Sequence, residues 1–238
     1  MKKKGKIIIV TGGNGRFAQI FKSIKSKYKF IFPSKKQLDI TNKLKIINYL
    51  KKIKPYAVLH LAGLSRPMSI HNSNISKSIN LNIVGTANVV TSCEKLNVKI
   101  IYMSTSYVYE GKRGNYKETD PVLPWNNYAW SKLGGECSVQ MYKNSLILRA
   151  CVTQKPFIHK EAFSNVNLNF IFHDEIVPIM IKLFSKKGIY NVGGKTQTVY
   201  QFAKKYNKKV KKKLSKGDFP LNPSINLSKI KKSLKDGI

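Results

Sequence analysis

The sequence predicts an α/β fold built on a parallel, doubly wound sheet. Short apolar segments of the strand type alternate with longer segments in which apolar residues recur every three or four positions. This alternation is typical of parallel sheets whose strands are joined by helical crossovers. In addition, the first strand runs directly into a glycine-rich turn and a helix, as it does in many nucleotide-binding proteins.

Residues 7–24, IIIVTGGNGRFAQIFKSI, contain the first strand, the turn and the first helix. Ile7 to Val10 form the continuous apolar run that a buried parallel strand requires. Gly12, Gly15 and Ala18 then follow the pattern G-x-x-G-x-x-A, which allows a tight turn, close approach of a phosphate and close helix packing. We therefore predict a Rossmann dinucleotide-binding core with a pyrophosphate at the helix N-terminus. A plain strand-to-helix turn is the alternative.

The end of the second expected strand, residues 28–32, bears on the choice of cofactor. In dinucleotide folds this end meets the adenosine ribose, where an acidic residue favours a free 2′-hydroxyl and basic residues accommodate a 2′-phosphate. Ser34, Lys35 and Lys36 follow this strand, and the first carboxylate comes only at Asp39. We therefore expect NADP rather than NAD, with NAD as the alternative, since lysines are common throughout this chain.

The remaining elements follow from periodicity. Strands are expected at residues 57–62, 98–104 and 145–150, and helices at 44–53, 74–96 and 125–142. The residues expected on the buried faces of the first two of these helices are Leu44, Ile47, Leu50 and Ile53, and Ile75, Ile79, Ile83, Val84, Ala87 and Val90. We expect the Rossmann core to span residues 1–150. Residues 151–238 would then hold the rest of the sheet, a reduced substrate lobe and a lysine-rich C-terminal segment.

The net charge of +33 raises the question of nucleic-acid binding. Of the 44 basic residues, 40 are lysine, whereas recognition of bases and phosphates favours arginine. The lysines are also spread over the whole chain, so we expect a solvated basic surface and no specific nucleic-acid partner. Residues 204–216, KKYNKKVKKKLSK, are the densest patch and would bind polyanions in a salt-sensitive way.

Several classes of protein are not expected. The apolar runs are shorter than the roughly 20 residues that span a bilayer, so no membrane insertion is predicted. Cys93, Cys137 and Cys151 are odd in number and widely spaced, which indicates a reducing cytoplasm and no disulfide framework. The four histidines never pair at metal-ligand spacing, so no metal site is predicted.

Tyr128 and Lys132 are the candidate chemical groups. They are four residues apart and share one face of an expected helix. A lysine ammonium beside a phenol favours the phenolate, which lowers the tyrosine pKa and allows it to exchange a proton with a carbonyl oxygen. The motif STSYVYEG, residues 104–111, adds hydroxyl groups at the carboxyl end of the fourth strand, where ligands bind in open α/β sheets.

With these motifs the chain resembles the extended short-chain dehydrogenases/reductases that act on nucleotide sugars. The motifs that carry the resemblance are TGGNGRFA, LDIT, HLAG, NIVGT, STSYVYEG and YAWSK, in the order and at the spacing of the family. LDIT and STSYVYEG are most similar to the dTDP-4-dehydrorhamnose reductase branch. The resemblance is strong over residues 5–150 and weaker over residues 170–194, which look like the family's substrate-lobe helix and the strand after it.

The resemblance implies a role for each matching residue. Thr105 would hydrogen-bond the sugar carbonyl, Tyr128 would exchange the proton, and Lys132 would hold the nicotinamide ribose. Ser106 and Tyr107 would join Thr105 at the substrate. The remaining cofactor contacts implied are Gly12, Gly15, Arg16 and Phe17 at the pyrophosphate, Asp39 and Ile40 at the adenine, and Leu61, Ala62 and Gly63 at the ribose. Ser34 and Lys35 are expected at the 2′-phosphate from their place after the second strand.

The expected function is therefore NAD(P)H-dependent reduction of a keto group on a nucleotide-activated sugar, in surface polysaccharide biosynthesis. A nucleotide-sugar epimerase or dehydratase that retains its cofactor is one alternative, and a non-catalytic, cofactor-binding regulatory subunit is another. After Arg149 the family carries a longer insertion than this chain does. With a reduced lobe, the substrate could be smaller than a nucleotide sugar, or a partner subunit could complete the lobe. A homodimer is one such possibility.

Overall fold

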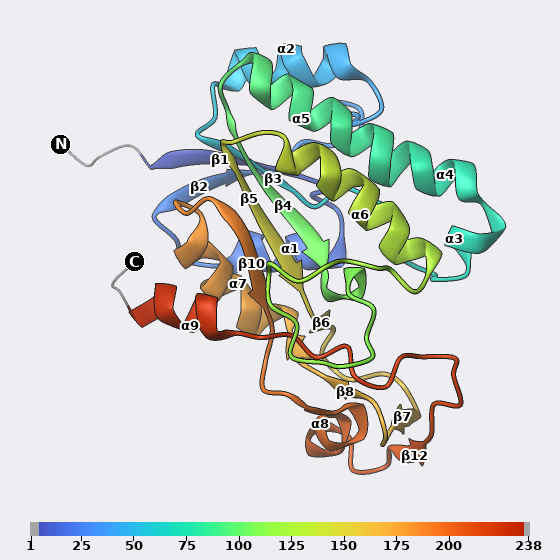
Figure 1. Cartoon of the computed structure of the whole chain (residues 1–238). Coiled ribbons are helices and arrows are strands. Elements are labelled where there is room, and N and C mark those ends of the chain that lie inside the picture. The colour runs from blue at the N-terminus through green and yellow to red at the C-terminus, as the bar shows by residue number, and fades with distance from the viewer. Residues whose placement is uncertain (1–4, 236–238) are drawn as a thin grey trace. The chain divides into compact units, whose positions relative to one another are not determined.

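The fold was analysed in a computed structural model that describes residues 5–235 (Figure 1). The chain divides into two compact units. Unit 1 consists of the segment that ends at Ser104, together with Trp130–Ile147 and Phe184–Gly188. Unit 2 consists of Thr105–Ala129, Leu148–Leu183 and the segment that begins at Ile189. Each unit is thus assembled from three separate stretches of sequence.

The main sheet has six strands in the order β10-β5-β4-β3-β1-β2 among the described residues. Its strands are β1 (Lys6–Thr11), β2 (Tyr28–Ile31), β3 (Ala57–His60), β4 (Lys99–Thr105), β5 (Ser145–Ala150) and β10 (Gly188–Val192). β1 pairs in parallel with β2 on one side and β3 on the other, and β3 pairs in parallel with β4. The predicted parallel, doubly wound sheet is confirmed.

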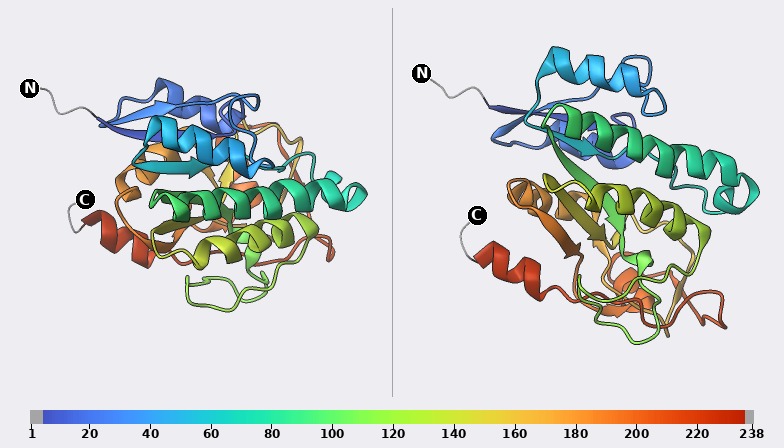
Figure 2. Two further views of the ribbon diagram at one scale, coloured as in Figure 1. Left: turned by 90° about the horizontal axis from the view of Figure 1, so that it is seen from above. Right: turned by 45° about the horizontal axis from the view of Figure 1, so that its top comes forward.

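The helical segments are α1 (Arg16–Ser23), α2 (Lys43–Ile53), α3 (Ile70–Ser73), α4 (Ile75–Ile79), the π-helical η1 (Asn80–Val84), α5 (Gly85–Lys95), the short 3₁₀ turn η2 (Ser106–Val108), α6 (Asn127–Gln140), α7 (His173–Leu183), α8 (Val199–Tyr206) and α9 (Ser228–Lys235). The chain moves across the sheet in one direction from β1 to β2 and in the other direction from β2 through β3 to β4. Because crossovers are right-handed, this reversal places α1 on one face and α2 and α5 on the other. Figure 2 shows α2 and α5 side by side.

The core of unit 1 lies on both sides of β1. Ile8, Ile9 and Val10 are fully buried, as the apolar run of this strand predicts. At the edge of the sheet Phe184 is fully buried against Phe21 of α1, with ring centroids 6.3 Å apart, and against Tyr28 of β2 at 5.6 Å. Phe184 therefore completes an aromatic cluster with Phe21 and Tyr28, which lie within the first 30 residues.

Two details of the predicted helix faces are wrong. Leu44 of α2 is 71% exposed, because Ile46, Ile47 and Leu50 form the buried face. The helix expected at residues 74–96 is α4, η1 and α5 in succession, and Ile75, Ile79 and Val84 are 54%, 42% and 44% exposed. In their place this helical segment buries polar side chains, among them Ser78 and Asn82.

Hydrogen bonds explain why these polar residues are turned inward. Ser78 Oγ lies 2.7 Å from Nδ1 of the buried His71. Asn82 accepts a hydrogen bond from the Leu64 amide and donates to the Leu64 carbonyl and to Ser131 Oγ. Partners of this kind offset the cost of burying a polar group, so they can override a pattern of apolar residues.

Unit 2 contains three small two-stranded sheets among its described residues. They pair β6 (Val152–Thr153) with β9 (Ile171–Phe172), β7 (Glu161–Phe163) with β12 (Lys211–Lys213), and β8 (Asn167–Leu168) with β11 (Gln197–Thr198).

A buried polar network also stabilises unit 2. The guanidinium of Arg149 donates to the Tyr109 hydroxyl at 2.9 Å, and that hydroxyl donates to Asn191 Oδ1 at 2.8 Å.

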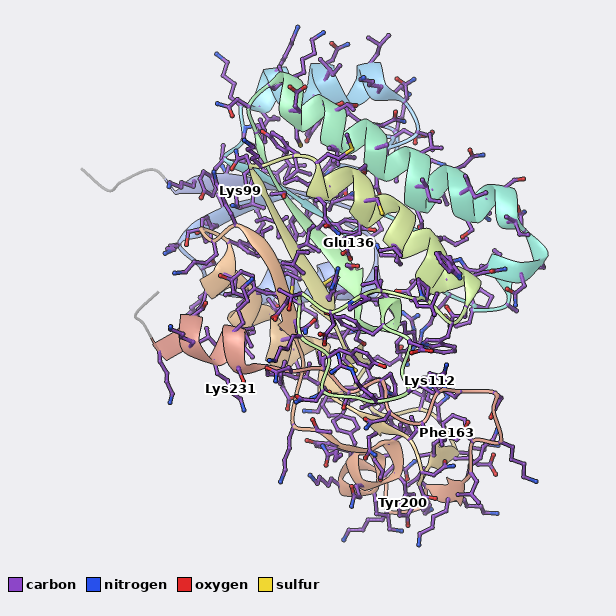
Figure 3. The ribbon with its side chains drawn as sticks, viewed as in Figure 1. Lys99, Lys112, Glu136, Phe163, Tyr200 and Lys231 are labelled. Carbon is purple, nitrogen blue, oxygen red and sulfur yellow. The ribbon has the colours of Figure 1, made fainter. Side chains whose placement is uncertain are left out.

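The lysine-rich segment 204–216 runs from α8 into β12. Two of its lysines lie over aromatic rings of unit 2, Lys212 over Tyr200 and Lys213 over Phe163, each 5.4 Å from the ring centroid. Figure 3 shows Phe163 and Tyr200 in the region of β7 and α8. All three residues of β12 are exposed, as a solvated basic surface requires.

Candidate active site

The glycine-rich turn lies where the strand order of unit 1 reverses, between the carboxyl ends of β1 and β3. This reversal point is the usual ligand site of doubly wound sheets. Gly12 has φ +70°, and a Cβ atom there would lie 2.8 Å from the Ala62 backbone. The Gly15 amide donates to the Gly12 carbonyl at 2.8 Å. The turn is therefore tight and packs directly against the residues that follow β3.

Gly15 is the N-cap of α1. Because glycine has no side chain, it cannot accept a hydrogen bond from the first amides of the helix, and nothing at the cap projects toward a ligand. Ala18 is buried beneath this first turn. The arrangement fits a pyrophosphate, which needs exposed backbone N–H groups at a helix N-terminus and no obstructing Cβ atom.

A chain of hydrogen bonds fixes the loop after β3. Thr86 Oγ1 donates to the Asn82 carbonyl, so it accepts from His60 Nε2 at 3.1 Å. His60 Nδ1 then accepts from Thr11 Oγ1 at 2.8 Å, and Thr11 Oγ1 in turn accepts from the amides of Leu61 and Ala62. His60 is thus neutral with its proton on Nε2, and burial, together with the charge of Lys132, lowers its pKa to about 3.

The residues expected at the adenosine end lie between β2 and α2. Ser34 and Lys35 are exposed, and Lys35 Nζ lies 4.0 Å from Asp39 Oδ2. Burial raises the pKa of Asp39, but hydrogen bonds from the Thr41 amide and hydroxyl and the charge of Lys35 outweigh it, so the net shift is downward. Ile40 is buried against Gly85 at the start of α5.

Tyr128 and Lys132 are one turn apart on α6, as the spacing predicts. Within unit 1, the Lys132 ammonium lies 4.2 Å from the centroid of the Tyr102 ring, and the Tyr102 hydroxyl donates to the Lys132 carbonyl at 2.9 Å. Desolvation lowers the pKa of Lys132 to about 7, although Glu136 opposes this shift. The Lys132 amine is therefore cationic below about pH 7 and neutral well above it.

Glu136 is a residue that the sequence-based prediction missed. It is fully buried in unit 1, where it accepts from Ser104 Oγ at 2.5 Å and from Gln140 Nε2 at 3.0 Å. Its signal in the sequence is the spacing of four residues after Lys132, which places a carboxylate one helical turn from an ammonium. Figure 3 labels it on α6.

Thr105, Tyr107 and Tyr128 belong to unit 2. Thr105 ends β4 and accepts from the Tyr107 amide at 3.3 Å. The rings of Tyr107 and Tyr128 meet edge to face at 6.4 Å, and Tyr107 also contacts Trp125 at 5.1 Å. Within the described residues, the buried indole Nε1 of Trp125 has no hydrogen-bond partner. Ser106, in contrast, is fully buried, so its side chain faces the interior.

Over residues 5–235 the structure shows neither a clustered metal site nor a helix able to span a membrane. No three His, Cys, Asp or Glu side chains in this range gather as a metal site would require. None of the helices in the same range has the length and apolar character needed to cross a bilayer.

The model of the family described as the RmlD substrate binding domain matches residues 6–166. The chain belongs to this family. The predicted resemblance to the nucleotide-sugar reductases among the short-chain dehydrogenases/reductases is thereby confirmed at the level of the family. The match includes the glycine-rich turn, β3, β4 and the whole of α6.

Among curated relatives, the chain is 27% identical over 151 residues to a dTDP-4-dehydrorhamnose reductase from Aggregatibacter actinomycetemcomitans, covering 61% of this chain and 51% of the relative. It is also 27% identical over 129 residues to methionine adenosyltransferase 2 subunit beta from Pongo abelii, covering 54% and 37%. The chain thus spans about half of the reductase and less of the subunit.

A solved structure gives the fold comparison. The dTDP-4-dehydrorhamnose reductase from Bacillus anthracis, determined in complex with NADP, has a TM-score of 0.86 to this chain at 20% identity. The superposition covers 100% of this chain and 94% of that protein. The likeness confirms the Rossmann-like α/β fold.

Proposed function

We propose that the chain is an NADPH-dependent reductase of a keto group on a nucleotide-activated sugar, acting in surface polysaccharide biosynthesis. The observation that carries the proposal is the spacing of Tyr128 and Lys132, one turn apart on α6, with the Lys132 amine 4.2 Å from the centroid of the Tyr102 ring. Membership of the family and the glycine turn at the switch point support it.

The proposed cofactor is NADP, with NAD as the alternative. The exposed side chains of Ser34 and Lys35 after β2 support a contact with the 2′-phosphate. The Lys35 ammonium also lies 4.0 Å from the Asp39 carboxylate. The turn of Gly12 and Gly15, with the first amides of α1 at Arg16 and Phe17, would hold the pyrophosphate. Asp39 and Ile40 would border the adenine, and Leu61, Ala62 and Gly63 the ribose.

The proposed mechanism assigns a task to each reacting side chain. The bound dinucleotide supplies the hydride for the carbonyl carbon. Tyr128 donates its phenolic proton to the carbonyl oxygen, and Thr105 holds that oxygen through its hydroxyl. The Lys132 ammonium stabilises the phenolate that remains and binds the nicotinamide ribose. Because the reaction needs the ammonium form of Lys132, turnover is expected to fall as the pH rises through the lysine pKa.

The proposed substrate side consists of Thr105, Tyr107 and Trp125 in unit 2. The unpartnered indole N–H of Trp125 is a donor that a sugar hydroxyl or phosphate could satisfy. Its ring contacts Phe219 at 4.5 Å and Tyr107 at 5.1 Å, which fixes its orientation. Ser106 is assigned to the interior of this unit, since its side chain is fully buried.

The deciding experiment follows NADPH absorbance while the protein is mixed with a panel of 4-keto nucleotide sugars. Oxidation with one substrate is expected, with a higher kcat/KM for NADPH than for NADH. Tight NADPH binding without oxidation of any substrate would contradict the reductase. Cofactor that then survives dialysis would indicate an epimerase or dehydratase instead.

A regulatory subunit is the second candidate, and the similarity to methionine adenosyltransferase 2 subunit beta favours it. Such a protein would bind the dinucleotide reversibly without turning over any sugar. The same assay distinguishes the two candidates, because only the reductase consumes NADPH in proportion to added substrate.

We further propose a homodimer and a cytoplasmic location. Ile75 and Ile79 of α4 and Trp130 of α6 are exposed apolar side chains of unit 1, which supports burial against a second copy. Light scattering should give twice the chain mass, and Ile79→Lys should lower it to the monomer. A monomeric wild-type mass would contradict the dimer.

The three free cysteines support the proposed cytoplasmic location, because the cytoplasm is a reducing compartment.

A further inference from the structure

The Lys132 side chain lies in desolvated surroundings, where an unpaired positive charge raises the free energy of the folded protein. Its ammonium faces an aromatic ring on one side, the Tyr102 ring at 4.2 Å. A cation over a ring is stabilised, but by less than full hydration provides. Below the lysine pKa, a second group must supply negative charge if the ammonium is to remain there at moderate cost.

The geometry points to Glu136 as the positioning residue that keeps Lys132 charged and in place on α6. Glu136 follows Lys132 by one turn on α6 and is 0% exposed. Each of its two carboxylate oxygens has a hydrogen-bond partner, since Oε1 accepts from Gln140 Nε2 on α6 and Oε2 accepts from Ser104 Oγ on β4. A carboxylate with a partner at each oxygen is held in one orientation, one helical turn from the lysine.

Strand β4 provides a contact for Lys132 and another for Glu136. Tyr102 and Ser104 are two residues apart on β4 and therefore point to the same face of the strand. Tyr102 faces the ammonium and Ser104 faces the carboxylate. The strand thus presents one partner to each member of the pair on α6, and the Tyr102 hydroxyl also fixes the backbone of Lys132.

The other titratable groups around Lys132 do not supply the charge. His60 on β3 is neutral, because Nδ1 accepts from Thr11 and its pKa is about 3. Tyr102 donates its hydroxyl proton to the Lys132 carbonyl. Tyr128, on the preceding turn of α6, is the proposed proton donor and is neutral before reduction. Glu136 is the group whose negative charge opposes the effect of desolvation on Lys132.

The test compares Glu136→Gln with the wild type in urea unfolding from pH 5 to pH 9. Glutamine keeps the shape and its one oxygen can accept from Ser104. Its amide nitrogen can donate to Gln140 once that amide turns over, so the main loss is the charge. Since the folded pKa of Lys132 lies near 7 and the unfolded value near 10.5, the folded lysine must carry its charge below pH 7 and releases it above. The variant should therefore be clearly less stable at pH 6, and the difference should shrink as the pH rises to 9.

Two controls make the outcome decisive. Glu94→Gln removes a carboxylate from the exposed end of α5 and should give a small difference that does not change with pH. In a Lys132→Met background, Glu136→Gln should lose its pH dependence, because no ammonium remains to be balanced. A loss of stability of equal size at every pH in the wild-type background, or a pH-dependent loss that persists in the Lys132→Met background, would overturn the proposal.

The consequence for catalysis rests on the proposed function and has a separate readout. In Glu136→Gln the alkaline loss of kcat/KM should move to lower pH by about one unit or more, which is a tenfold or larger change in the protonation equilibrium of Lys132. An unchanged pH profile in an active variant would overturn the proposal. If the wild type has no turnover, the proposed reductase fails, whereas the unfolding data still decide the role of Glu136.

Discussion

Replacing Tyr128 by phenylalanine is expected to reduce turnover by about 10²–10⁴-fold while NADPH binding stays nearly unchanged. The substitution removes the proposed proton donor and keeps the ring, so the edge-to-face contact with Tyr107 remains. Steady-state kinetics and fluorescence titration with NADPH measure the two effects separately.

Tyr142→Phe is the matched control for this variant. Tyr142 lies just beyond the end of α6, where its hydroxyl donates to the Val98 carbonyl at 3.1 Å. Its loss should lower the free energy of unfolding by about 1 kcal/mol and leave kcat unchanged. Turnover that survives in Tyr128→Phe would show that another group donates the proton.

Gly12→Ala is the second substitution with a large expected effect. The new Cβ atom would meet the Ala62 backbone at 2.8 Å, and the residue would be held at φ +70°, which costs about 1–2 kcal/mol for a residue other than glycine. The loop of Leu61 and Ala62 must then move away from the turn. We expect NADPH affinity to fall by more than about tenfold, since a misplaced turn loses over 1.4 kcal/mol of phosphate contacts.

Gly188→Ala is the control that separates the cost of a positive φ from the cost of displacing a neighbour. Gly188 has φ +87°, but a Cβ atom there would have nothing within 4 Å. Its alanine variant should lose the same conformational energy without displacing a neighbour, and NADPH binding should not change. Equal loss of NADPH affinity in the two variants would indicate that the glycine turn is not the phosphate site.

The elements that depend on local sequence were predictable. The run from Ile7 to Val10, the glycine turn and the segment at 145–150 predict β1, its turn and β5, because a buried parallel strand needs a continuous apolar run. That Tyr128 and Lys132 lie on one helix was predictable, because their spacing equals one helical turn. The buried state of His60 also follows from its place within an apolar strand.

Features that depend on contacts between distant residues were not predictable. Asn82 turns inward because Leu64 and Ser131 supply its hydrogen bonds, and neither partner is near it in sequence. Ile75 and Ile79 of the same helical segment are exposed instead. Glu136 was missed because its burial depends on Ser104, 32 residues away on β4. The small strands of unit 2 have only two or three residues each, too few for a periodicity.

The division of the chain has a consequence for how the protein is made. Phe184 fills the core beside Phe21 and Tyr28, yet it is synthesised more than 150 residues after them. While the chain grows, that aromatic surface stays uncovered until residue 184 has left the ribosome. A nascent chain halted at residue 150 should therefore expose it to chaperones, and an expression clone ending there should yield aggregated protein.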